Sequence, residues 1–136
     1  MVREIIRDQF FLRMPARNAG AGDIPIADDL LDTLRANADR CVGMAANMIG
    51  ENVAVIAFSD GGRYMEMFNP VIVRRDAPYD AEEGCLSLDG TRPVRRYRTI
   101  KVQWQTRDMK PRVRTFTGFT AQIIQHEIDH LAGVVI

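Results

Sequence analysis

The chain has 136 residues, enough to bury one core and too few to divide, so residues 1–136 are expected to form a single domain. Basic and acidic residues each total 18, so the charge balance does not favour nucleic acid or an anionic membrane as a partner. No apolar run is long enough to span a bilayer, and the N-terminus mixes charged with apolar residues, unlike a signal peptide. These features predict a cytoplasmic protein with no membrane contact and no specific nucleic-acid partner.

The first predicted element is an amphipathic helix that runs to about Asp39. Asp23 is a suitable N-cap and Pro25 suits the first helical turn. The apolar residues that then recur at helical spacing are Ile26, Leu30, Leu31, Leu34 and Ala38. This stripe predicts packing on the core.

Small residues dominate the next stretch, residues 41–50. Small side chains allow a second backbone to approach closely, so this stretch can form one wall of a narrow cleft. It can equally be a tight helix or turn packed on the core. The residues alone leave both interpretations open.

Five strands are predicted after it, at residues 53–58, 64–68, 71–74, 99–106 and 113–116. Asp60-Gly61-Gly62 favours a hairpin turn between the first two, and Asn69-Pro70 separates the next pair. One helix, several antiparallel strands and a final helix indicate an α+β fold in which antiparallel sheet packs around the last helix.

The final helix carries the pattern H-E-x-x-H. His126 and His130 are the only histidines, and residues four apart lie on one helical face, so both imidazoles can bind one metal ion. Glu127 lies beside them, where its carboxylate can take a proton from water at the metal. Thr117 or Thr120 can cap the helix and Gly133 can end it. Its burial is predicted by the apolar residues Ile123, Ile124, Ile128 and Leu131.

A catalytic site of this kind needs a third protein ligand, and no ligating side chain follows His130. The two cysteines upstream, Cys41 and Cys85, are the candidates. Cys85 is favoured because Gly84 before it allows unusual backbone angles and the amide of Leu86 after it can point into the cleft. On these grounds Cys41 remains a competitor.

These residues resemble the peptide deformylases, which share the motifs G-x-G-φ-A-A-x-Q, E-G-C-L-S and Q-H-E-x-D-H. The second motif is intact at residues 83–87 and the third at residues 125–130. In the first motif Gly43, Ala45 and Ala46 match, whereas Cys41 replaces the first glycine and Met48 replaces the glutamine. Order and spacing match over nearly the whole chain.

The resemblance implies removal of the N-formyl group from the formylmethionine of nascent peptides, beside ribosomes. It implies that Cys85, His126 and His130 hold one divalent metal ion, ferrous iron in the cell, with zinc, nickel or cobalt able to replace it. Glu127 would then be the general base, and the Leu86 amide would donate to the oxyanion. The substrate-binding positions that the resemblance implies are Gly43, Gly84 and Arg92.

Met48 is the main departure from the family pattern. The family's glutamine donates a hydrogen bond to the developing oxyanion, and a methionine side chain has no N–H. Losing one such donor typically costs about 3 kcal/mol, so we expect reduced or altered activity. Asn47, Gln122 or Gln125 can supply a replacement amide.

Gln122 is the favoured candidate of the three because it lies four residues before His126 and therefore on the helix face that carries the two histidines. Phe119 and Ile123 on that side of the helix can line a pocket for the methionine side chain, which a polar Gln122 would reshape. The alternative is that Gln122 meets solvent at the cleft edge.

A basic run precedes the fourth predicted strand, with members Arg92, Arg95, Arg96 and Arg98. Such a run can contact RNA, but the favoured interpretation is a solvent-exposed strand whose arginines balance the charge of nearby acidic residues.

Two functions therefore follow from the sequence. The first is an active metal-dependent deformylase. The second is a deformylase-like protein with weak or altered amidase activity, or one that holds metal and binds peptide N-termini. Retention of Glu127 favours catalysis, because a binding protein needs no base beside the metal.

Overall fold

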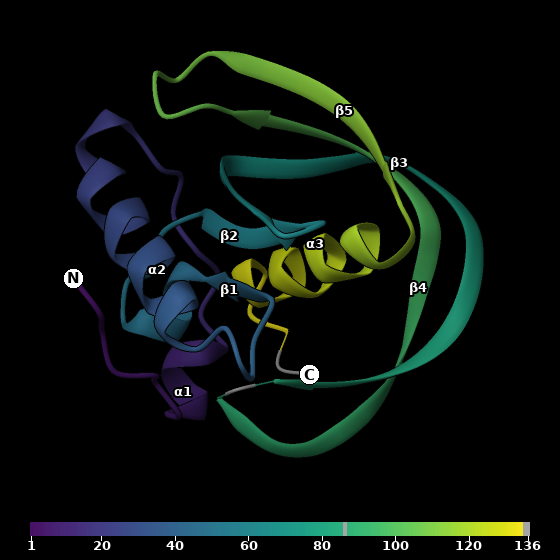
Figure 1. Ribbon diagram of the computed structural model, residues 1–136, viewed down its shortest axis with the longest axis horizontal. Coiled ribbons are helices and arrows are strands. Elements are labelled where there is room, and N and C mark those ends of the chain that lie inside the picture. The colour runs from purple at the N-terminus through teal and green to yellow at the C-terminus, as the bar shows by residue number, and fades with distance from the viewer. Residues whose placement is uncertain (86, 135–136) are drawn as a thin grey trace.

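A curved antiparallel sheet surrounds the C-terminal helix in the computed structural model (Figure 1). The structure describes residues 1–85 and 87–134, and within them five strands lie in the sheet in sequence order. The strands are β1 (Gly43–Ala45), β2 (Val55–Asp60), β3 (Arg63–Cys85), β4 (Leu88–Gln105) and β5 (Pro111–Thr117). The helices are α1 (Gln9–Leu12), α2 (Ile24–Ala36) and α3 (Gly118–Leu131), with the 3-10 turns η1 (Ala21–Asp23) and η2 (Ala46–Ile49).

Strand β2 is buried on both faces. Side chains alternate along a strand, so Val55 and Ala57 join the apolar cluster beside α2, while Ile56 and Phe58 join the cluster beside α3. All four are fully buried. This double burial explains why the strand appears in the sequence as a continuous apolar run.

The two long helices cover opposite sides of this region, with α2 outside the sheet and α3 within its curve (Figure 1). Helix α2 buries Leu30 and Leu34 and ends slightly before the predicted Asp39. Helix α3 has Thr117 at its N-cap, although the predicted side-chain cap hydrogen bond does not form. Gly133 follows its end with φ of 81°, as a helix-ending glycine does. Among the described residues, no helix is both long and apolar enough to cross a membrane.

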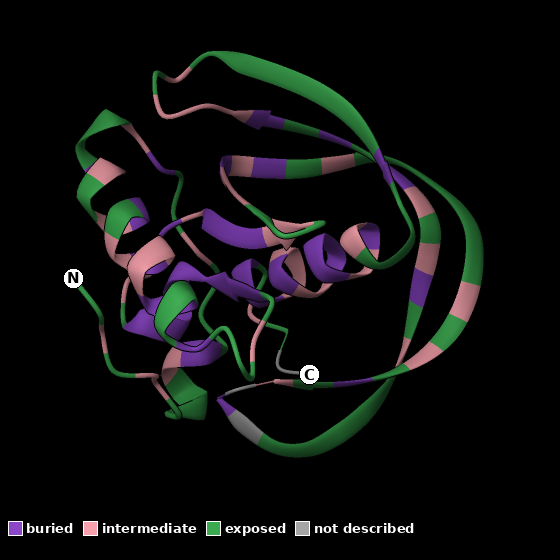
Figure 2. Ribbon diagram, viewed as in Figure 1, coloured by how far each residue is buried: buried purple, intermediate pink, exposed green. Residues whose placement is uncertain are grey.

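The α+β prediction is confirmed, but two strands are far longer than predicted. Strand β3 runs on from Asn69-Pro70 to Cys85, and β4 begins well before residue 99. The expected break is instead a register shift around Asn69, whose φ is 51°. The parts of β3 and β4 that extend beyond the predicted strands are mostly exposed (Figure 2). Because neither face of these parts is buried, their residues do not alternate between apolar and polar, which is the pattern that predicts a strand.

Candidate metal centre

Three side chains with metal-binding atoms meet where the end of β3 approaches α3. The ligand atoms of Cys85, His126 and His130 all lie within 4.8 Å of one another. The two histidine Nε2 atoms are 3.1 Å apart, as the helical spacing of four residues predicted. Two imidazole nitrogens and a sulfur form a donor set that suits a single iron, zinc or similar divalent ion.

The second cysteine is outside this group of ligand atoms. The Cys41 thiol donates a hydrogen bond to the Gly43 carbonyl oxygen at 2.8 Å. Burial raises the pKa of the Cys41 thiol to about 12, so it stays protonated at neutral pH. Since a thiol binds metal as the thiolate, the structure favours Cys85 over Cys41 as the third ligand.

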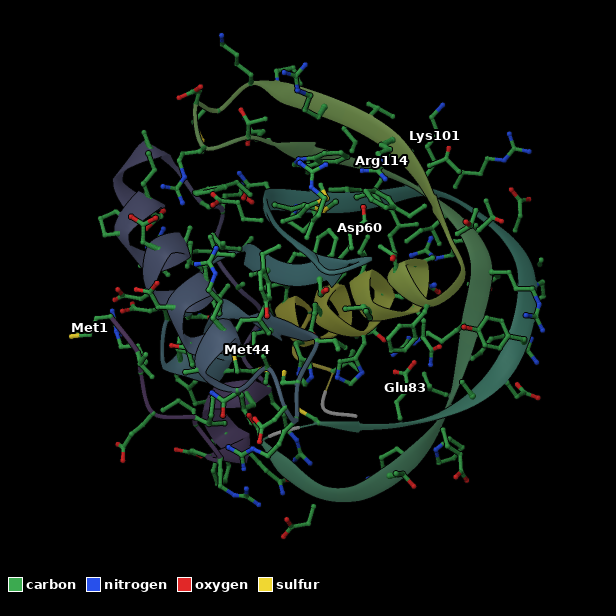
Figure 3. The ribbon with its side chains drawn as sticks, viewed as in Figure 1. Met1, Met44, Asp60, Glu83, Lys101 and Arg114 are labelled. Atoms are coloured by element: carbon green, nitrogen blue, oxygen red, sulfur yellow. The ribbon has the colours of Figure 1, made fainter. Side chains whose placement is uncertain are left out.

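Glu83 orients His126. Its Oε1 lies 2.8 Å from His126 Nδ1, which leaves the Nε2 atom for a metal ion. Burial would raise the pKa of Glu83, but hydrogen bonds with His126, Arg96 and Gln122 outweigh burial and lower the pKa to about 2. Glu83 is therefore ionised at neutral pH, and Figure 3 shows it between β3 and α3.

Arg96 and Gln122 complete the surroundings of this carboxylate. Arg96 binds both Glu83 oxygens, at 2.6 and 2.9 Å, and Gln122 Nε2 donates to Glu83 Oε2 at 2.9 Å. The third Arg96 nitrogen, Nη1, donates to Asp129 on α3 at 2.6 Å. Arg96 is only 3% exposed, so the prediction of a solvated arginine is wrong for this residue. Gln122 likewise has a protein partner instead of simply meeting solvent.

Glu127 is the buried acid of the site. It is 3% exposed, and its Oε1 has no hydrogen-bond partner among the described residues. Burial raises the pKa of Glu127 to about 7, and the charge of His126 opposes that rise. Its Oε2 would lie 2.9 Å from a Cβ atom placed on Gly43, so only glycine allows β1 to approach this closely.

The electrostatics of the histidines favour a cation between them. Burial lowers the pKa of His126, but the acidic groups Glu127, Cys85 and Glu83 raise it to about 10. For His130, burial and the charge on His126 lower the pKa to about 3, which keeps this imidazole neutral. Binding a divalent cation at both Nε2 atoms requires His126 to release its proton, and the acidic groups that raise its pKa would then stabilise the bound cation, so these residues fit a metal ion.

A cavity of about 260 Å³ opens in front of these residues. Of the residues predicted to contact substrate, Gly43, Gly84, Phe119 and Ile123 line it. Arg92 does not line it and is exposed, and Leu86 lies outside the described residues. The remaining lining residues are Arg40, Cys41, Val42, Met48, Glu82, Glu83, Cys85, Gln122, His126 and Glu127.

Two of the three amides proposed to replace the missing glutamine, those of Asn47 and Gln125, donate to backbone carbonyl oxygens. Asn47 donates to the His130 carbonyl oxygen at 2.9 Å. Gln125 donates to the carbonyl oxygens of Tyr97 and Ala121. Met48 lines the cavity with 1% exposure. The cavity wall therefore has an apolar side chain at the position where the motif predicts a donor.

Two residues of this centre have roles that the sequence patterns do not predict. Glu83 is part of an intact motif, but the motif alone does not indicate that it is the partner of His126. Arg96 cannot be distinguished by sequence from the other arginines of its basic run. Metal-bound histidines usually donate to a carboxylate or carbonyl group. The position of Glu83, two residues before the proposed ligand Cys85, is therefore the sequence feature that could have suggested it as a histidine partner.

Comparisons with known proteins identify the family. The sequence model of the family described as polypeptide deformylase matches residues 8–136. A peptide deformylase of Clostridium beijerinckii is 46% identical over 136 residues, covering 100% of both chains. Among solved structures, a class I type b peptide deformylase from Acinetobacter baumannii has a TM-score of 0.90 at 29% identity and covers 99% of this chain and 97% of its own.

The peptide deformylase from Thermus thermophilus has a TM-score of 0.88 at 32% identity, covering 99% of this chain and 83% of its own. Another structure of the Acinetobacter baumannii enzyme, 26% identical with a TM-score of 0.90 and the same coverage of 99% and 97%, is described as bound to Met-Ala-Ser. Because the family model matches nearly the whole chain and a relative aligns from end to end, this chain belongs to the peptide deformylase family.

Proposed function

We propose that this protein is a metal-dependent hydrolase that removes the formyl group from the N-terminal formylmethionine of peptides, releasing formate. The observation that supports this most directly is the convergence of the ligand atoms of Cys85, His126 and His130 to within 4.8 Å. Cys85, His126 and buried Glu127 also line the cavity. Because formylated peptides arise at ribosomes, the protein would act near them in the cytoplasm.

Cys85, His126 and His130 would hold one divalent ion, with ferrous iron as the proposed cellular metal and zinc, nickel or cobalt as substitutes. Such an ion lowers the pKa of water and polarises a carbonyl oxygen. Glu83 holds the His126 ring through Nδ1 and so fixes the direction of Nε2.

Glu127 would move the proton in this reaction. It follows the ligand His126 directly, lines the cavity and has one oxygen without a protein partner among the described residues. It would take a proton from the attacking water and return it to the amine that leaves when the C–N bond of the formamide breaks. Its burial excludes the bulk water that would otherwise compete for the carboxylate.

The cavity would bind the start of the peptide. Gly43 and Gly84 line it and would pair with the extended peptide backbone, while Phe119 and Ile123 would contact the methionine side chain. The Leu86 backbone amide is proposed as the oxyanion donor by resemblance to the family. Arg92, exposed on β4, would contact the peptide only beyond the cavity.

A second function is favoured by Met48. With an apolar side chain at this position, the protein would have weak or altered amidase activity, or would bind peptide N-termini without turnover. The rate of formate release from formyl-Met-Ala separates these functions: fast release supports the first, slow release supports weak amidase activity, and no release supports binding without turnover.

The test combines a formate-release assay with elemental analysis of anaerobically purified protein. We expect one equivalent of metal in the wild type and turnover that a chelator abolishes. Glu127→Gln should keep the metal and lower kcat by about a hundredfold or more, because only the base is lost. Cys85→Ala should lose both metal and turnover. Equal rates for wild type and Glu127→Gln would contradict the proposed mechanism.

A further inference from the structure

Gln122 places a neutral amide in the wall of a cavity that is lined by both apolar and charged side chains. It lies one helical turn before His126, and the apolar residues that line the same cavity include Phe119, Ile123 and Met48. These three offer the apolar surface that suits an unbranched side chain such as methionine. The amide of Gln122 is therefore a neutral polar group on the same helix as the apolar lining residues Phe119 and Ile123.

The amide is held in place by Glu83. Gln122 Nε2 donates to Glu83 Oε2 at 2.9 Å, and Glu83 in turn accepts from Arg96 and contacts His126. A glutamine amide has two N–H donors and one carbonyl acceptor. Only one of these donors is used by Glu83.

Among the described residues, the second N–H of Gln122 and its Oε1 have no hydrogen-bond partner in the protein. Both Gln122 and its partner Glu83 line the cavity, so the polar end of the side chain lies at the cavity wall. The Glu83 carboxylate already has Arg96, His126 and Gln122 around it, so it offers little further capacity to a ligand. Because the ionised Glu83 carboxylate only accepts hydrogen bonds, the remaining N–H of Gln122 is the donor that this pair offers to a bound side chain.

We propose that Gln122 is a specificity-determining residue that admits a first side chain bearing a hydrogen-bond acceptor, namely methionine sulfoxide. The inference rests on the proposed deformylase function and concerns the pocket for the first side chain. The sulfoxide has the length of methionine and carries one added oxygen, which needs a donor when it leaves water. Gln122 supplies that donor, whereas an aliphatic residue there would leave the oxygen unpaired.

The test compares kcat/KM for three peptides, formyl-Met-Ala, formyl-norleucine-Ala and formyl-(methionine sulfoxide)-Ala, with the two sulfoxide epimers measured separately. Norleucine has a similar shape and no acceptor. The variant Gln122→Met keeps an unbranched side chain but removes the N–H, and Gln122→Leu provides a second apolar variant. Gln103→Met, an exposed position on β4 outside the cavity, is the matched control.

We expect the ratio of sulfoxide to norleucine kcat/KM to fall about tenfold in both Gln122 variants and to stay unchanged in Gln103→Met. The ratio isolates specificity, because any effect on His126 through Glu83 changes both rates together. One epimer should account for most of the effect, since the donor is fixed. A change of less than twofold in the ratio would overturn the proposal.

Failure of the proposed function gives a different result, because the wild type would then release no formate from formyl-Met-Ala. In that case the affinities of Met-Ala and (methionine sulfoxide)-Ala, measured by calorimetry, replace the rates. If Gln122→Met binds only the sulfoxide dipeptide more weakly than the wild type does, the pocket assignment is supported. If its affinity for both dipeptides falls equally, the assignment is overturned.

Discussion

At the scale of single residues, Met48 is the main departure from the family motif. It lies in the cavity wall at the position where the family motif has glutamine, and it is 1% exposed. A thioether cannot donate to an oxyanion, so one donor of the usual arrangement is missing. The nearby amides of Asn47 and Gln125 are bound to backbone carbonyl groups and do not compensate.

Met48→Gln should therefore raise kcat for formyl-Met-Ala by about tenfold or more, with little change in KM, because the new hydrogen bond strengthens as charge develops. Steady-state formate release measures both constants. Met48→Leu is the control and should leave kcat within about twofold of wild type. An unchanged kcat in Met48→Gln would show that the oxyanion is already fully satisfied.

Asp23 provides a residue-scale test of pH-dependent stability. Hydrogen bonds from Arg17 and from the Gly20 amide lower the pKa of Asp23, against the opposing effect of burial. A carboxyl group with a depressed pKa in the folded state stabilises the fold above its unfolded pKa and loses that contribution as pH falls.

Asp23→Asn should thus lower the free energy of unfolding at pH 7, and its difference from wild type should shrink below about pH 4. Urea unfolding at several pH values measures this. Asp39→Asn, at an exposed position, changes the same charge without removing an ion pair and should show no such trend. A constant difference from pH 7 to pH 3 would contradict the assignment.

At the scale of elements, the contact between β1 and α3 decides the geometry of the site. Strand β1 pairs with β2, and Gly43 brings its backbone against Ile123 and Glu127. A Cβ atom on Gly43 would lie 2.6 Å from Ile123 Cγ2, which is closer than packed atoms allow. The run of small residues therefore forms a cleft wall through β1 and a tight turn through η2, so both interpretations left open by the sequence are correct in part.

Gly43→Ala should push β1 away from α3, with a loss of about 1–3 kcal/mol in stability and at least tenfold in kcat/KM. Thermal unfolding and formate release measure the two effects. Gly22→Ala is the matched control, because a Cβ atom there would have no neighbour within 4 Å. If both variants behave like wild type, the close approach of β1 is not required.

At the scale of the whole molecule, one buried ion cluster joins the long hairpin to the metal-site helix. Glu83 comes from β3, Arg96 from β4 and Asp129 from α3. The side chains of Arg96 and Glu83 are 4% and 7% exposed. This cluster ties the sheet to the helix that carries both histidines, so stability and metal affinity should depend on it together.

Arg96→Met should lower the free energy of unfolding by about 3–5 kcal/mol, because it leaves Glu83 buried with fewer partners. It should also weaken metal binding by loosening His126. Arg95→Met is the adjacent control, since its ion pair with Asp80 spans 3.8 Å with both side chains largely exposed and should contribute less than about 1 kcal/mol. Equal effects of the two substitutions would argue against the cluster.

The sequence by itself determined the α+β class and the placing of His126 and His130 on one helical face, because helical periodicity acts over four residues. It also indicated the family, since the motifs are contiguous. The tertiary structure alone decided that the Cys41 thiol donates a hydrogen bond to the Gly43 carbonyl oxygen and that Arg96 is buried. It also decided that the Glu83 carboxylate contacts His126 Nδ1. The Arg96–Asp129 and Glu83–His126 contacts join residues 33 and 43 positions apart. Such distant pairings depend on how the sheet curves around α3, which local sequence patterns do not specify.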